Sequence, residues 1–126
     1  MAPSETPLPF SIGVARITPT AHVASVGGEV DLHNEAELRA TLEPLVETDE
    51  ATVIVDLCDV SFVDSTALGV FVALAKRLRA RQGRLVLVSA DPRFSKLLRV
   101  TGLLSLLHLE TSLAKAVEGI GIPAPA

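Results

Sequence analysis

The sequence predicts an α/β sandwich in one domain: a mixed, mostly parallel sheet of about five strands, with an N-terminal hairpin and about four helices. The first observation behind this prediction is the order of the elements, two strands followed by alternating helices and strands, which is typical of parallel strands joined by right-handed crossovers. The second is composition, because 48% of the 126 residues are hydrophobic and the only aromatic residues are four Phe. Such a chain builds its core from aliphatic side chains, which suits buried strands covered by helices.

A hairpin is expected at the start of the domain. Residues 1–9 contain three prolines and are expected to form a flexible tail. Phe10 to Thr18 and Ala21 to Val26 are predicted as strands because their apolar residues alternate with others, and Pro19-Thr20 between them is a turn signal. Gly27-Gly28 is expected to end the second strand.

A helix and a buried strand are predicted next. The helix runs from about His33 to Val46, with Asp31 or Asn34 as the cap at its start. Pro44 is expected to bend or stop it, because proline lacks an N–H group and clashes with the preceding turn. Ala51 to Leu57 contains a continuous β-branched run, which is typical of a strand covered on both faces.

The second half of the chain continues the alternation. Five further elements are predicted there: a helix over Thr66–Arg81, a strand over Leu85–Val88, a short helix that starts at Asp91-Pro92, a strand over Leu106–Leu109 and a helix from Leu113 to about Ile120. In the short helix Phe94, Leu97 and Leu98 are expected to point inward, with Val100 a further candidate. Residues 121–126 are expected to form a second flexible tail, so that the domain spans residues 10–120.

Charge is distributed unevenly along the chain. Residues 1–64 have a net charge of −10 and residues 65–126 a net charge of +6. A polarised surface of this kind steers charged partners. The basic residues are spread over several elements of a chain that is acidic overall, so direct binding to nucleic acid is not expected.

The sequence also limits the setting of the protein. No signal peptide and no apolar run long enough to cross a membrane are visible, so we expect a cytoplasmic protein without a membrane partner. The single cysteine, Cys58, excludes an intramolecular disulfide and a cysteine cluster for zinc. Its position after an apolar run predicts a small core residue.

Asp64-Ser65-Thr66 is the triplet with the most chemical content, because it lies where a predicted strand passes into a predicted helix. A hydroxyl at a helix N-terminus lies where free N–H groups and the helix dipole favour an anion, so a phosphate on this serine would be tolerated. The alternative is that Ser65 or Thr66 is only an N-cap, a role that these residue types favour.

Other chemistries fit the sequence less well. Its three histidines are far apart and lack ligand spacing, and the residues around Ser65 lack the Gly-x-Ser-x-Gly pattern of a hydrolase. Asp56, Asp59 and Asp64 could in principle hold a magnesium ion, but solvated loop carboxylates are the more common case. We therefore predict no catalytic residue, no metal site and no cofactor.

Four stretches resemble the STAS domain, and more narrowly the bacterial anti-sigma factor antagonists. The longest runs from Val53 to Gly69 and is similar to the family signature. It consists of an apolar strand, Asp56-Leu57, a short link and Phe62-Val63-Asp64-Ser65-Thr66-Ala67-Leu68-Gly69. Gly28-Glu29-Val30-Asp31 matches the family's loop before the first helix. Gly83 to Val88 and Phe94 to Leu103 match the later strand and helix, so the resemblance covers roughly residues 10–118.

The resemblance implies a binding module and kinase substrate rather than an enzyme. In that family the serine after the Asp, here Ser65, is phosphorylated by the anti-sigma factor, which is itself a serine kinase; Thr66 is a minority candidate. The unphosphorylated antagonist binds this kinase and frees the sigma factor, phosphorylation reverses the binding, and a metal-dependent serine phosphatase resets the protein. The alternative is a STAS scaffold of a stress-sensing complex, or a soluble transporter partner, that phosphorylation does not switch.

We expect a single partner face on this domain. Its residues are Glu29, Asp31, Asp64, Ser65, Thr66, Val70 and Leu74. The last two enter because their stripe on the predicted helix is more apolar than a solvent-facing surface needs. Ala67 stands where the family usually has glycine, and its extra methyl group two residues from Ser65 predicts either slower phosphorylation or a relative that binds without being switched.

Overall fold

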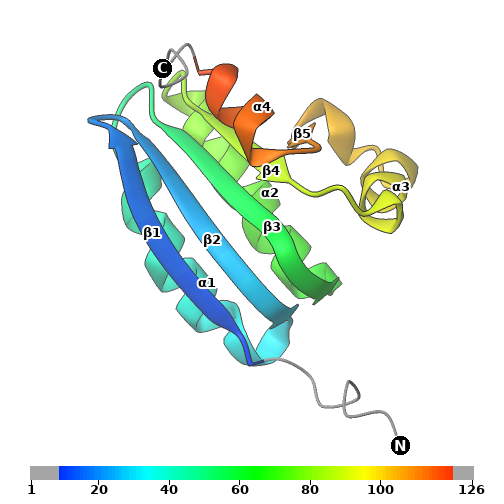
Figure 1. Ribbon diagram of the computed structural model, residues 1–126. Helices are drawn as coiled ribbons and strands as arrows, with labels where there is room; N and C mark the ends of the chain where they lie inside the picture. Colours follow the sequence, from blue (N-terminus) through cyan, green and yellow to red (C-terminus); the bar gives the residue numbers. More distant parts are fainter. Residues whose placement is uncertain (1–8, 121–126) are drawn as a thin grey trace, which may run out of the picture.

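Five strands form one sheet, in which the spatial order β1-β2-β3-β4-β5 is also the order along the chain (Figure 1). In the computed structural model, which describes residues 9–120, the strands are β1 (Ser11–Thr18), β2 (Ala21–Val30), β3 (Thr52–Val63), β4 (Arg84–Val88) and β5 (His108–Glu110). β1 and β2 form the expected antiparallel hairpin, and every other neighbouring pair is parallel. The predicted fold class is confirmed.

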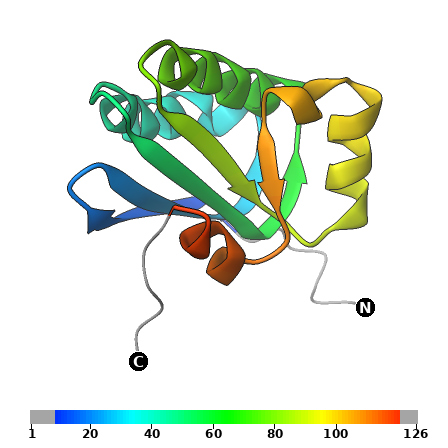
Figure 2. The same ribbon diagram turned by 90° about the horizontal axis from the view of Figure 1, so that it is seen from above.

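The helices lie on both faces of this sheet. Within the described residues they are α1 (Glu35–Leu42), α2 (Ser65–Ala80), α3 (Pro92–Val100) and α4 (Leu113–Glu118), with short 3-10 helices η2 (Leu32–Asn34), η3 (Glu43–Val46) and η4 (Leu103–Ser105). Figure 2 shows α1 and α2 on one face, α4 on the other, and α3 at the side of the sheet after the end of β4.

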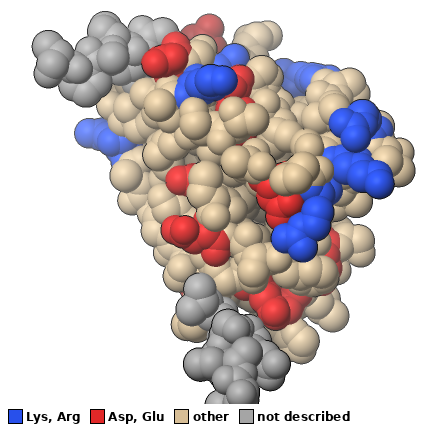
Figure 3. Space-filling model, turned by 45° about the vertical axis from the view of Figure 1, so that its right-hand side comes forward, with Lys and Arg blue, Asp and Glu red and all other residues tan. Residues whose placement is uncertain are grey.

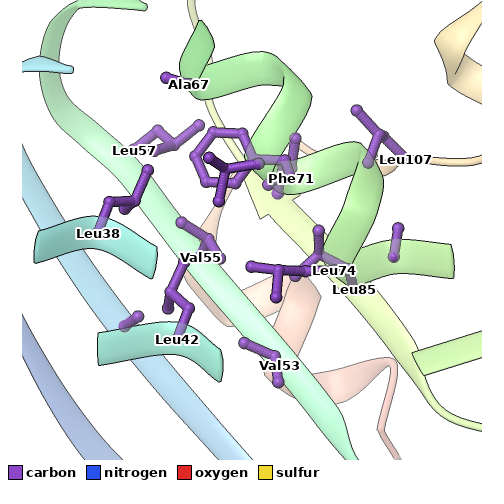
Figure 4. Close-up of a cluster of buried hydrophobic side chains, with 14 of the residues drawn as sticks. Leu38, Leu42, Val53, Val55, Leu57, Ala67, Phe71, Leu74, Leu85 and Leu107 are labelled. Carbon is purple, nitrogen blue, oxygen red and sulfur yellow. The ribbon is translucent and has the colours of Figure 1, made fainter. Parts of the chain in front are cut away.

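The larger part of the core lies between the sheet and the pair α1 and α2 (Figure 4). Phe71 and Leu74 of α2 pack there with Leu38 and Leu42 of α1 against β3, and all four side chains are buried. A smaller cluster around Ile54 lies on the other face, under α4. Because β3 is buried on both faces over its first half, its β-branched run is explained.

β2 and β3 are both longer than predicted. Gly27-Gly28 lies inside β2 and does not end it. A Cβ atom added at Gly27 would lie 2.8 Å from the Ser11 hydroxyl oxygen, so glycine at this position lets β2 pass close beside β1. β3 continues to Val63, which pairs with Val30 at the end of β2. The two strands therefore end side by side, and the residues that follow them are neighbours.

Other expectations fare differently. Pro44 lies in η3, so α1 stops at Leu42 as the proline predicted. α3 buries Phe94 and Leu98 but leaves Leu97 and Val100 exposed, so the prediction that Leu97 and Val100 point inward was wrong.

The tails predicted at the two ends lie outside the described residues, apart from the exposed Pro9. Within residues 9–120 no helix is both long and apolar enough to cross a membrane.

Candidate functional site

Asp64 joins the two strand ends. It is the N-cap of α2, with extended backbone angles, and its Oδ1 accepts a hydrogen bond of 2.9 Å from the Ala67 N–H group. Its Oδ2 accepts a second bond, 3.1 Å long, from the N–H group of Leu32, the first residue of η2. Its own N–H group donates to the Val30 carbonyl at 3.1 Å. One carboxylate therefore fixes the start of α2 relative to the start of η2.

The loop after β2 is held by a second set of hydrogen bonds. Asp31 caps η2 by accepting from the His33 N–H group at 2.9 Å, and the Asn34 side chain accepts from the Asp31 N–H group at 2.9 Å. The Asn34 amide also donates to the Glu29 carbonyl at 3.0 Å. This reciprocal capping orders the loop and places Asp31 directly before Leu32, whose N–H group donates to Asp64.

Ser65 is the exposed first residue of α2. Because Asp64 is the cap, the alternative that Ser65 or Thr66 serves only as N-cap is wrong, and the Ser65 hydroxyl is not consumed by capping. Within residues 9–120 it makes no hydrogen bond, and neither do the N–H groups of Ser65 and Thr66. Thr66 is half-buried, so Ser65 is the more accessible of the two hydroxyls.

Val70 and Leu74 do not belong to a surface. Each is only 1% exposed, and both pack in the core with Phe71. The expectation that they form part of the partner face was wrong, because the stripe they occupy faces the sheet. The sequence could not show this, since α2 is apolar on two sides and only the position of the sheet decides which sides are covered.

Ala67 is also a core residue. Its side chain is fully buried beside Leu57 (Figure 4), although it lies two residues from the exposed Ser65. The methyl group that distinguishes this chain from the family pattern therefore points away from the surface that presents the serine.

Leu32 is a surface residue that the sequence analysis missed. Its side chain is 64% exposed, and its N–H group is the one that Asp64 binds. The sequence did contain a signal for this exposure: Leu32 is an apolar residue directly after the Asp31 cap, in the first turn of a helix, where polar residues are more common. The structure thus places Asp31, Leu32, Asp64 and Ser65 in one region, with Glu29 half-buried at its border.

The alternative of a magnesium site is not supported. Within the described residues no group of three or more His, Cys, Asp or Glu side chains is arranged to hold a metal ion. Asp56 instead turns back on its own strand, where its Oδ1 accepts from the Cys58 N–H group at 3.0 Å, and Asp64 is engaged by two N–H groups.

Cys58 is exposed, which corrects the expectation of a core residue. A hydrogen bond to Asp56 raises the pKa of its thiol to about 11, with desolvation and the negative charges of Asp56 and Asp59 acting in the same direction. Each of these effects opposes formation of the thiolate.

Comparison with known proteins identifies the class. The STAS domain profile matches residues 14–116 of this chain, so the chain belongs to the STAS domain family. It is 37% identical over 94 residues to the anti-sigma-B factor antagonist of Listeria monocytogenes, a match that covers 75% of this chain and 78% of that protein. It is 36% identical over 84 residues to the anti-sigma-B factor antagonist of Staphylococcus aureus, covering 67% and 78%. Within the family, the chain is one of the anti-sigma factor antagonists.

Solved structures show the same fold. An anti-sigma factor antagonist from Mycobacterium paratuberculosis superposes with a TM-score of 0.78 at 24% identity, covering 96% of this chain and 98% of that one. The anti-sigma factor antagonist SpoIIAA in its unphosphorylated form gives a TM-score of 0.73 at 23% identity, covering 90% and 100%.

The first prediction concerns the junction at Asp64. Replacing Asp64 with Ala leaves two N–H groups without acceptors, and should lower the free energy of unfolding by about 1–2 kcal/mol, the usual cost of a lost cap. Amide hydrogen exchange should accelerate at Leu32 and Ala67 together. Asp31→Ala is the matched control, and should accelerate exchange at His33 without affecting Ala67. Unchanged exchange at Leu32 in Asp64→Ala would show that the carboxylate does not join the two segments.

The second prediction concerns Cys58. With a thiol pKa of about 11, only about 0.1% is thiolate at pH 8, so iodoacetamide should alkylate it roughly a hundredfold more slowly than an unperturbed cysteine. Asp56→Asn removes one negative charge and the carboxylate acceptor, and should raise the rate at least about tenfold. Mass spectrometry of timed samples measures this. Alkylation of the wild-type chain at the rate of a free thiol would contradict the assignment.

Proposed function

We propose that the chain is an anti-sigma factor antagonist whose unphosphorylated form binds an anti-sigma factor serine kinase, and whose binding is reversed by phosphorylation of Ser65. The observation that carries the proposal is the exposed hydroxyl of Ser65, which makes no hydrogen bond within residues 9–120 and lies at the first position of a helix that another residue already caps. The chain acts in this proposal as a binding module and substrate, not as an enzyme.

The surroundings of Ser65 tolerate a phosphate. The N–H groups of Ser65 and Thr66 lack acceptors among the described residues, and a helix N-terminus with free N–H groups favours an anion. The Ala67 and Leu68 N–H groups remain bound to Asp64, so the helix start keeps its cap. Phosphorylation therefore needs no rearrangement of the helix.

The same phosphate acts strongly on a partner. It adds about −1.5 to −2 charges at neutral pH to a surface that already carries the Asp31 and Asp64 carboxylates. A bound kinase with ATP phosphates or acidic groups opposite this surface would be repelled. A loss of about 3 kcal/mol in binding free energy lowers affinity more than a hundredfold, so release follows without refolding.

The revised partner face consists of Asp31, Leu32, Asp64, Ser65 and Thr66, with Glu29 at its border. Leu32, and not Val70 or Leu74, supplies the apolar contact of this face, because its side chain is exposed and its N–H group donates to Asp64.

Related proteins support this cycle. The relatives from Listeria and Staphylococcus carry the name anti-sigma-B factor antagonist, and one structure with the same fold is that of the Bacillus cell fate determinant SpoIIAA in a phosphorylated form, with a TM-score of 0.70 at 22% identity. We further propose that a metal-dependent serine phosphatase resets Ser65, and that the cycle runs in the cytoplasm, where ATP and sigma factors are found.

The third prediction tests the acceptor residue. Incubation with the cognate anti-sigma factor kinase and ATP should add one phosphate by intact mass. Ser65→Ala should abolish it, and the matched variant Thr66→Val should keep it. Ser65→Asp should weaken kinase binding at least about tenfold in calorimetry, because it places a charge at the same position. Absence of phosphate, together with stable binding to a complex that contains no kinase, would favour an unswitched STAS scaffold instead.

The fourth prediction concerns Ala67. Because its methyl group is buried, Ala67→Gly should leave the rate of Ser65 phosphorylation within about twofold of wild type. It should lower the free energy of unfolding by about 1 kcal/mol, since glycine is a poor helix former. Initial phosphorylation rates and urea unfolding measure the two effects. A tenfold faster phosphorylation of the glycine variant would mean that the methyl group does obstruct the kinase.

A further inference from the structure

A groove opens between β3 and α3 because β3 is longer than its neighbour. β4 pairs with β3 only from Thr52 to Asp56, and it ends at Val88, where the chain turns away into α3. From Leu57 to Val63 the edge of β3 that faces away from β2 has no strand beside it within the described residues. The space that a longer β4 would fill is left open.

The groove is apolar and small. Its lining includes the buried side chains of Leu57 and Phe94 and the exposed side chains of Phe62 on β3 and Leu97 on α3. Its charged lining residues are Asp91 and Arg93, which pair with each other. Phe62 is 53% exposed. The volume of about 190 Å³ is below the roughly 300–1,000 Å³ of small-molecule sites, so it suits one large side chain rather than a whole ligand.

Two exposed apolar side chains line this groove. They are Phe62 and Leu97, two of the six large hydrophobic side chains that are exposed among residues 9–120, and a third, Val100, lies on α3 three residues after Leu97. Scattered single residues of this kind are ordinary on a protein surface, whereas a cluster indicates a binding site.

The exposed surface of α3, the helix that carries Leu97, is basic. Arg93, Lys96 and Arg99 are exposed on α3, and the sequence has no acidic residue from position 92 to position 109. Asp91 neutralises Arg93 through a contact of 2.8 Å, which leaves Lys96 and Arg99 without a carboxylate partner among the described residues. Figure 3 shows Lys and Arg side chains gathered at the right of the view, on the side of the molecule where α3 lies.

We propose that this groove docks an extended, acidic segment of a partner protein. Three observations each determine one property of the segment. The unpaired edge of β3 accepts an extended backbone. The groove accepts one large apolar side chain, and Lys96 and Arg99, exposed on the helix that carries Leu97, attract carboxylates elsewhere on the same segment. The register of β3 against β2 shifts at Leu57-Cys58 and again at Ser61. These irregularities keep any pairing with a further strand short, so the side chain supplies most of the affinity.

Other occupants fit less well. The site is concave, so a flat bilayer surface would not fill it, and the chain as a whole has a net charge of −4, which opposes anionic lipid. Ser65 does not line the groove, although Val63, two residues before it, does. Docking in the groove is therefore tested separately from phosphorylation of Ser65.

The test uses the full-length chain and a phage-displayed library of random eight-residue peptides. Peptides that also bind the Leu97→Asp variant are removed during selection. Leu97 is exposed, so this replacement should leave the fold intact, which circular dichroism and the melting temperature will check. We expect the selected peptides to share one large apolar residue flanked by Asp or Glu. A synthetic peptide of that sequence should bind Leu97→Asp and the double variant Lys96→Glu, Arg99→Glu at least tenfold more weakly than wild type in fluorescence anisotropy.

Val14→Asp is the matched control. Val14 is an exposed apolar residue on β1, at the opposite edge of the sheet, and its replacement should leave peptide affinity unchanged. Peptides that are basic, that bind Leu97→Asp as well as wild type, or that fail to enrich would overturn the proposal. Two further results, measured without peptide, would also overturn the proposal. One is binding to phosphatidylserine vesicles that Leu97→Asp abolishes, and the other is self-association in sedimentation velocity that Leu97→Asp abolishes.

Discussion

The hydrogen bonds that the Asp64 carboxylate accepts at 2.9 and 3.1 Å hold the start of α2 against the loop that follows β2. The sheet makes this possible, because β2 and β3 are parallel neighbours that end at the same level, Val30 beside Val63. Without that register the carboxylate would cap one helix only. Everything proposed for Ser65 depends on this junction, since it fixes the position of the serine and frees its hydroxyl from capping.

The two sides of α2 have separate tasks. One side carries Ala67, Val70 and Leu74 into the core, and the N-terminal end presents Ser65 to solvent. A regulatory charge can then be added at the surface without touching the packing that stabilises the sheet. In the proposed cycle a phosphate on Ser65 would therefore change binding through charge on a surface that is already formed.

The strand and helix order, the hairpin and the stop at Pro44 could be predicted from periodicity and turn residues, because these are local properties. The position of Ser65 at the start of α2 and the Asp31 loop could be predicted from the family signature. The partner face could not be predicted in full. α2 is apolar on two sides, and the choice between core and surface for Val70 and Leu74 depends on how the sheet lies beneath it. The exposure of Leu97 likewise depends on where β4 ends, which no local pattern records.

The central claim is that phosphorylation of Ser65 changes the charge of a preformed surface and not the fold. The most direct measurement compares amide chemical shifts of the unphosphorylated and fully phosphorylated chain by two-dimensional ¹H–¹⁵N NMR. The account predicts that shifts change around residues 30–34 and 62–69, the two segments joined at Asp64, and stay unchanged in β4, β5 and α4. Changes that spread through those elements would show that phosphorylation acts by rearranging the domain, and would contradict the account.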